Sequence, residues 1–149
     1  SPDLIPATTP RWFNLDHFNG PPAITNWVCG ANFGEFAPSD LMNGMGDILN
    51  LSRGSLKWKI TVPKDGKLPY EGAVPALIDW GDSKHPTDTL KETGCRMTKF
   101  RIKHKFAANL RSSLSGLLSD QRIEFVCTSG AGSYELWIET PQKGTVIIK

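Results

Sequence analysis

Three carboxylates and one tryptophan are the side chains of this sequence whose types and spacing could form a polar site. Asp79 lies near the end of the strand-like run PALIDW, and Glu135 and Glu139 flank Trp137 in the run YELWIET. Because side chains alternate across a strand, Glu135, Trp137 and Glu139 share one face. That face could line a cavity with carboxylates beside an aromatic wall. The alternative is a solvated outer face, with the intervening apolar residues in the core.

Two histidines could lie at the rim of such a site. His104 shares a strand face with apolar residues, which favours a partly buried histidine over a base or a ligand. His85 stands in a His-Pro turn, where hydrogen bonds that fix the loop are the first interpretation and a substrate contact is the second. We therefore name His85, His104 and Trp137 as candidate ligand-binding residues and name no catalytic residue.

The elements that would carry these residues are clearest in the second half of the chain. Residues 96–106 alternate between two faces, one of them basic, as in a half-buried strand. The following run, AANLRSSLSGLL, repeats leucine at helical spacing. Three short β-rich runs come next, RIEFVC, SYELWIET and GTVIIK. The predicted order is therefore β-α-β-β-β.

The first half contains a weaker copy of the same order. AITNWVC (23–29) predicts a strand, and residues 39–49 have roughly helical spacing after a capping Ser or Asp. SLKWKITV predicts a strand whose two lysines and Thr61 face outward. VPALIDW (74–80) predicts a further strand. The repeat concerns the order of elements, since no residue motif recurs.

These patterns divide the chain into four segments. The N-terminal segment is rich in Pro and Thr and leads to an aromatic cluster that begins with Trp12 and Phe13. Such a cluster is too large to leave in water, so we expect it to dock on the main body. The predicted segments are an extended N-terminal arm or linker (1–22), a first βαβββ-like module (23–80), a connecting loop (81–95) and a second βαβββ module (96–149).

Composition indicates an ordinary globular chain. Its 149 residues suit one domain or two small modules that share a core. The formal net charge of +2 gives no global field for nucleic acid, and no apolar run approaches the ~20 residues of a membrane helix. The basic strand face of Lys99, Arg101, Lys103 and Lys105 could bind an anionic surface, although such a face is usually the solvated side of a strand. We expect neither a membrane nor a nucleic-acid partner.

Cysteine usage indicates the compartment. Cys29, Cys95 and Cys127 are an odd number without CxxC spacing, which argues against a disulfide framework. We expect all three to be small buried hydrophobic residues. A chain without structural disulfides fits a reducing compartment, so the expected location is the cytoplasm.

One stretch of the sequence carries a family resemblance. The segment ALIDWGDSKHPTDTLKETGCRMTKFRIKH contains the run W-G-x-x-x-H-P from Trp80 to Pro86, and WKITVP upstream and ETPQKGTVII downstream fit the same pattern. Over residues 11–149 the chain resembles the glyoxalase-like domain family, a divergent branch of the vicinal oxygen chelate superfamily. The resemblance implies an α+β fold of paired βαβββ modules, whose curled mixed sheets form a half-open barrel around a small-molecule cavity. It also implies a further module ahead of the point where this chain begins.

The resemblance bears on metal binding too. Metal-dependent members of the superfamily place a His near the start of a module's first strand and a Glu on its last strand. Neither AITNWVC nor the start of the strand at Arg96 contains such a histidine. A divalent Mn, Fe, Ni or Zn ion would therefore depend on carboxylates, with Asp79, Glu135 and Glu139 as its candidate ligands.

The first functional prediction is a glyoxalase-like domain that binds a small organic ligand in its sheet cavity. The alternatives are a metal-dependent lyase or dioxygenase of the vicinal oxygen chelate type and an anionic-surface or nucleic-acid binder. The missing histidines favour the binding domain over the enzyme. A homodimer is expected as well, because open sheet edges can pair with a second copy.

Overall fold

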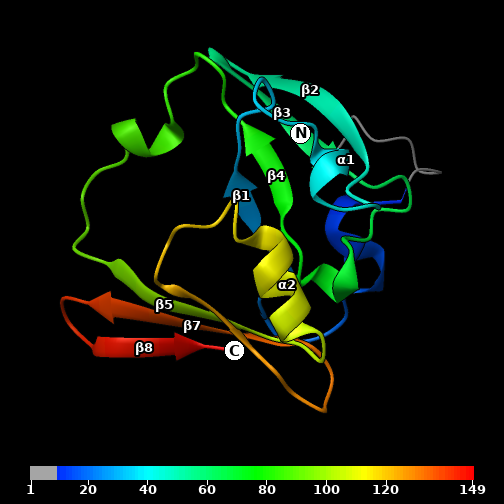
Figure 1. Ribbon diagram of the computed structural model, residues 1–149. Helices are drawn as coiled ribbons and strands as arrows, with labels where there is room; N and C mark the ends of the chain where they lie inside the picture. Colours follow the sequence, from blue (N-terminus) through cyan, green and yellow to red (C-terminus); the bar gives the residue numbers. More distant parts are fainter. Residues whose placement is uncertain (1–9) are drawn as a thin grey trace. The chain divides into compact units, whose positions relative to one another are not determined.

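The computed structural model describes residues 10–149, and contacts within the chain divide it after Gly81 into two compact units (Figure 1). Each unit contains one mixed four-stranded sheet and few helical residues, and neither sheet closes on itself. The α+β class predicted from the sequence is therefore confirmed. No helix in the described part of the chain is long and apolar enough to span a membrane.

The first unit has the predicted order of strand, helix and three strands. Its sheet order is β1-β4-β3-β2, with β1 parallel to β4 and the other pairs antiparallel. The 3-10 helix η2 precedes β1 in the sequence, and a second 3-10 helix, η3, lies between β3 and β4. The elements are η2 (Trp12–His17), β1 (Val28–Gly30), α1 (Pro38–Leu41), β2 (Asp47–Arg53), β3 (Leu56–Val62), η3 (Tyr70–Gly72) and β4 (Ala76–Asp79).

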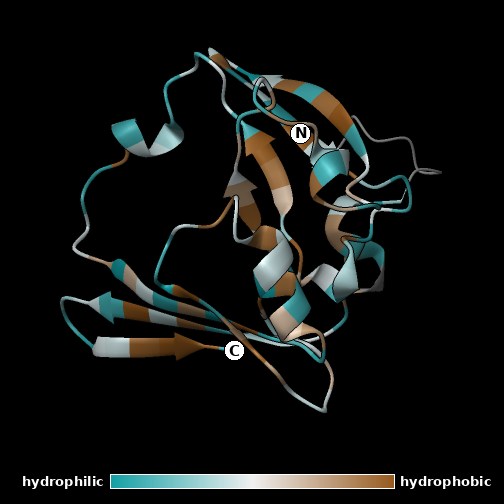
Figure 2. Cartoon of the chain, viewed as in Figure 1, coloured by the Kyte–Doolittle hydropathy of each residue, from teal (hydrophilic) through white to brown (hydrophobic). Residues whose placement is uncertain are grey.

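The core of the first unit explains why the N-terminal aromatic residues dock. A cluster of buried residues forms around Ile60, Val62, Leu68 and Ala76. Trp12 and Phe13 pack against this cluster, as do partly buried residues of β2, β3 and β4. Figure 2 shows the hydrophobic colour of β4, which lies in the interior of the sheet. The docking expected for the arm is thus observed for its first two aromatic side chains.

The helix predicted over residues 39–49 is wrong beyond its first turn. α1 covers only Pro38–Leu41, and β2 already begins at Asp47. Gly44 and Gly46 have φ angles of 86° and 84°, which belong to the left-handed region and interrupt a helix. A Cβ on Gly46 would lie 2.1 Å from the carbonyl carbon of Val62, so the chain turns tightly against β3 here. The strand predicted at 23–29 is also shorter, since β1 spans Val28–Gly30.

The second unit has the same element order with a different strand order. The sheet runs β6-β5-β7-β8, with β5 parallel to β6 and antiparallel to β7. In the first unit, by contrast, the first strand pairs in parallel with the last. The elements are η4 (Pro86–Thr89), β5 (Arg96–Lys103), α2 (Ala107–Leu114), β6 (Ile123–Val126), β7 (Ser133–Thr140) and β8 (Gly144–Ile148).

The core of the second unit follows the predicted periodicities, although the strand predicted over 96–106 ends at Lys103 and Phe106 beyond it is 46% exposed. Phe100 and Ile102 are buried on β5, and Leu110 and Leu114 are buried on α2 at helical spacing. Phe100 stacks on Tyr134 of β7 with ring centroids 5.8 Å apart. Figure 2 shows the alternation of hydrophobic and hydrophilic colours along α2 that this packing requires.

The cysteines depart from their predicted burial. Cys95 and Cys127 are exposed, and only Cys29 is partly buried. Cys95 follows the loop glycine Gly94, and Cys127 comes just after β6 ends, so neither lies inside a strand. All three thiols are free, and burial raises the pKa of Cys29 above its ordinary value.

Candidate functional site

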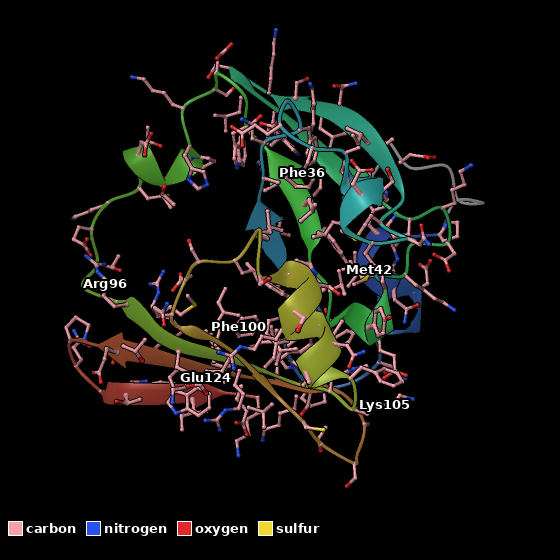
Figure 3. The ribbon with its side chains drawn as sticks, in the orientation of Figure 1. Phe36, Met42, Arg96, Phe100, Lys105 and Glu124 are labelled. Atoms are coloured by element: carbon pink, nitrogen blue, oxygen red, sulfur yellow. The ribbon has the colours of Figure 1, made fainter. Side chains whose placement is uncertain are left out.

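The predicted Glu135 and Trp137 lie on a charged face of the second sheet, formed by β5, β6 and β7. Arg101 on β5 is in register with Glu124 on β6 and with Glu135 on β7. Its guanidinium lies 3.1 Å from the Glu124 carboxylate and 3.2 Å from that of Glu135. Figure 3 labels Glu124 on this sheet. One cation is therefore held between two anions across three strands.

Lysines complete the ion pairs of this face. Lys103 donates to Glu135 at 2.6 Å, and Lys99 lies 3.2 Å from Glu124. The Glu135 side chain is only 12% exposed. The hydrogen bond from Lys103 is the first cause that lowers the pKa of Glu135, and the bond from Lys99 does the same for Glu124. Glu135 is thus held in place as a carboxylate, and its negative charge is balanced by Arg101 and Lys103.

Trp137 is also engaged by this network. The Arg101 guanidinium lies 4.9 Å from the centroid of the Trp137 ring, and the Lys99 ammonium lies 5.5 Å from it. These are cation–π distances. Three of the four basic residues predicted as an anionic-surface patch are therefore paired with carboxylates, which leaves little charge on this face for a nucleic acid.

Glu139 lies on the same face of β7 but apart from Glu135. Its carboxylate accepts a hydrogen bond from the Thr145 hydroxyl of β8 at 2.6 Å. The two glutamates are four positions apart on the strand, a span of about 13 Å between their Cα atoms at 3.3 Å per residue. Each carboxylate has its own partners, Thr145 for Glu139 and the cations of β5 for Glu135, so the structure does not bring the predicted pair together.

His104 directly follows β5 and is buried, with 2% of its surface exposed. Its Nδ1 accepts a hydrogen bond from the Phe106 backbone N–H at 3.2 Å, and the two rings are 5.6 Å apart. His85 caps η4, since its Nδ1 contacts the Thr87 hydroxyl at 2.6 Å and accepts from the Thr87 N–H at 3.3 Å. Both histidines thus have the structural contacts that were their first interpretation, and ligand binding by either stays a prediction.

Asp79 closes β4 in the first unit. One carboxylate oxygen accepts the backbone N–H of Gly81 at 2.7 Å, and the other accepts that of Phe33 at 2.9 Å. The hydrogen bond from Gly81 is the largest cause that lowers the pKa of Asp79, and the bond from Phe33 comes next. The carboxylate therefore fixes the loop after β1 against the end of β4.

Within the described part of the chain, the candidate metal ligands are not gathered into one donor set. Residues 10–149 contain no group of three or more His, Cys, Asp or Glu side chains placed to share an ion. Asp79, Glu135 and Glu139 each have the other partners given above. A metal role for these carboxylates stays a prediction for elemental analysis.

A different feature of the first unit offers room for a ligand. A hollow of about 390 Å³ opens between η2, the segment before β1 and the loop that contains η3. Its walls are both apolar and polar, and none of its lining residues belongs to a strand. The lining residues are Phe13, Asn14, Phe18, Thr25, Asn26, Lys67, Leu68, Glu71 and Gly72.

One backbone and one side-chain hydrogen bond hold the walls of the hollow in place. The Asn14 N–H donates to the Gly66 carbonyl at 2.9 Å, which docks η2 on the loop after β3. The Trp27 indole donates to the Ala73 carbonyl at 3.3 Å, which joins the segment before β1 to the end of η3. These two bonds fix the segments that line the hollow relative to one another.

The backbone of this region is strained. Four residues other than glycine have φ between 53° and 63°, namely Phe13, Asn14, Tyr70 and Glu71. Three of them line the hollow and Tyr70 adjoins it. Such conformations cost about 1–3 kcal/mol each and concentrate at functional sites. The strained backbone positions and the hollow therefore occupy the same region of the first unit.

A family comparison agrees with the sequence resemblance. The model of the glyoxalase-like domain family matches residues 1–118. The chain belongs to this family. The match covers the first unit and the second unit through α2, and it ends before β6. Comparisons with curated proteins and with solved structures gave no match.

Sequence reasoning missed the hollow of this glyoxalase-like domain. Its walls come from segments about fifty residues apart, so no local pattern joins them. The aromatic cluster that begins with Trp12 and Phe13 was the available signal, because it predicted docking. Asn14 was a second signal, since Asn tolerates the left-handed region better than most residues. Neither signal indicates what the segment docks beside.

Proposed function

We propose that this glyoxalase-like domain binds a small organic molecule in the hollow of its first unit. The observation that carries the proposal is a cavity of about 390 Å³ whose lining includes two aromatic and two charged side chains. That volume falls in the range of about 300–1,000 Å³ found for small-molecule sites. The charged face of the second sheet is a weaker candidate for the ligand site than the hollow, because its carboxylates and its tryptophan already have partners within the chain.

The proposed place differs from the sheet cavity expected from the sequence. The hollow is lined by η2 and by the loops before β1 and β4. Leu68 belongs to the core of the first unit and Phe13 packs against that core, so they give the hollow a fixed apolar wall. Phe18 is 43% exposed and extends that wall toward solvent.

A fluorescent probe tests this function. We use 1-anilinonaphthalene-8-sulfonate, whose aromatic body suits the wall and whose sulfonate suits Lys67. We expect saturable binding at one site, weakened several-fold in F18A. Phe106 is 46% exposed in the other unit, so F106A is a matched control that should bind as the wild type does. Equal binding by F18A and F106A would contradict the proposal.

Location and assembly are proposals of the same kind. We place the protein in the cytoplasm, which the three free thiols support.

We also propose a homodimer through β8, which lies at one end of its sheet and exposes Ile147 and Ile148. Light scattering of the wild type should then give twice the chain mass. The variant I147K should give the mass of the monomer.

A further inference from the structure

The charges of the hollow indicate the class of its ligand. This inference rests on the proposed function, since it assumes that the hollow binds a small molecule. We propose that the ligand is a zwitterion, in which a carboxylate and an ammonium group are attached to an apolar or aromatic body. Lys67 binds the carboxylate and Glu71 binds the ammonium group.

Lys67 supplies the positive charge of the hollow. Its side chain is exposed at the lining and has no ion pair among the described residues. The backbone at this point is fixed, because the Lys67 N–H donates to the Asp65 carboxylate at 3.0 Å and the next residue, Leu68, is buried. The ammonium therefore extends from an anchored segment and is available to a ligand anion.

Glu71 supplies the negative charge. It also lines the hollow, is exposed, and makes no ion pair in the described part of the chain. Its φ of 56° and ψ of 30° are held by the turn, in which Gly72 N–H donates to Pro69 and Ala73 N–H donates to Tyr70. Although Lys67 and Glu71 are four residues apart, no ion pair joins them. Two opposite charges thus share one cavity without neutralising each other.

The remaining walls suit the body of such a ligand. Phe13, Phe18 and Leu68 present apolar surface, and Thr25 and the amides of Asn14 and Asn26 present hydrogen-bonding groups. The Asn26 amide donates to the Thr25 hydroxyl at 2.8 Å, which orients it within the wall. Apolar walls with a few placed polar groups are typical of sites that orient one small molecule.

Three probes with the same aromatic body separate the two charges. L-phenylalanine carries both charges, 3-phenylpropanoate carries only the carboxylate, and 2-phenylethylamine carries only the ammonium group. Binding is measured at millimolar concentration by chemical-shift titration of the full chain. An exposed ion pair contributes up to about 1 kcal/mol, so we expect L-phenylalanine to bind up to about fivefold more tightly than either singly charged probe.

Variants assign each charge to its residue. K67M should weaken L-phenylalanine and 3-phenylpropanoate and leave 2-phenylethylamine unchanged. E71Q should weaken L-phenylalanine and 2-phenylethylamine and leave 3-phenylpropanoate unchanged. K84M removes an exposed lysine of the other unit and should change none of the three affinities.

Two results overturn the ligand class. One is equal affinity for the three probes, and the other is an equal effect of K67M and E71Q on all of them. If naphthalene-sulfonate binding still depends on Phe18 in that case, the hollow binds small molecules of another class and the proposed function survives. If that binding is absent as well, both proposals fail.

Discussion

The Thr61 hydroxyl accepts a hydrogen bond from the Leu77 backbone N–H at 2.9 Å, and both residues are fully buried. The paired residues of β3 and β4 are Lys59 with Asp79 and Ile60 with Ile78. The side-chain oxygen of Thr61 therefore continues the pairing where backbone pairing stops. The sequence placed Thr61 on the outer face because its strand alternates, and the structure corrects this by burying it.

Replacing Thr61 tests this contact. T61V keeps the size of the side chain but leaves the buried Leu77 N–H without its acceptor. We expect the free energy of unfolding, measured by urea denaturation, to fall by about 1–3 kcal/mol. T61S is the matched control, because it keeps the hydroxyl and removes only a methyl group. A variant T61S that is less stable than T61V would contradict the assigned role.

The ion pairs of Glu135 predict a dependence of stability on pH. Its pKa is lowered in the folded protein, first by the hydrogen bond from Lys103. Such a carboxylate stabilises the fold above its unfolded pKa of about 4.3, and the contribution is lost as the pH falls through the folded pKa. The gap in melting temperature between wild type and E135Q should therefore be widest near neutral pH and should close in acid.

The control for this pH series is on the same strand. E139Q removes a carboxylate that bonds to the Thr145 hydroxyl and makes no ion pair among the described residues. Its melting temperature should stay close to that of the wild type across the series. If the gap for E135Q is the same at acid and neutral pH, the ion pairs with Arg101 and Lys103 do not stabilise the fold.

Alanine substitutions at Gly46 and Gly54 separate two costs of adding a Cβ atom. One is the cost of a left-handed backbone conformation, and the other is the cost of a clash with a neighbouring strand. Both are left-handed, with φ of 84° and 60°. A Cβ on Gly46 would meet the Val62 backbone at 2.1 Å, whereas a Cβ on Gly54 meets nothing within 4 Å. G54A should cost about 1–2 kcal/mol for its conformation, and G46A should cost about 1–3 kcal/mol more. Equal losses in urea unfolding would show that the region around Gly46 relaxes freely.

The sequence predicted those parts of the fold whose pattern is local. β5 and α2 follow their periods of two and 3.6, so the burial of Phe100, Ile102 and Leu110 could be inferred. The helix over 39–49 failed because the glycine conformations outweighed an apolar spacing that a helix and a strand can share. The partners of Glu135 were unpredictable, because they depend on strand register across β5, β6 and β7. The hollow was missed because its walls join only in three dimensions.

Asp79 is the candidate metal ligand whose other role is best defined. Its two oxygens accept the N–H groups of Phe33 and Gly81, so D79A should remove both hydrogen bonds and lower the free energy of unfolding by about 1–3 kcal/mol. D79N keeps one carbonyl acceptor and should fall between wild type and D79A. We expect metal content, measured on protein purified without chelator or nickel affinity, to be the same in all three. A near-stoichiometric Mn, Fe, Ni or Zn signal that disappears in D79A would instead make the carboxylate a metal ligand, because the loss of two loop hydrogen bonds alone would not remove an ion.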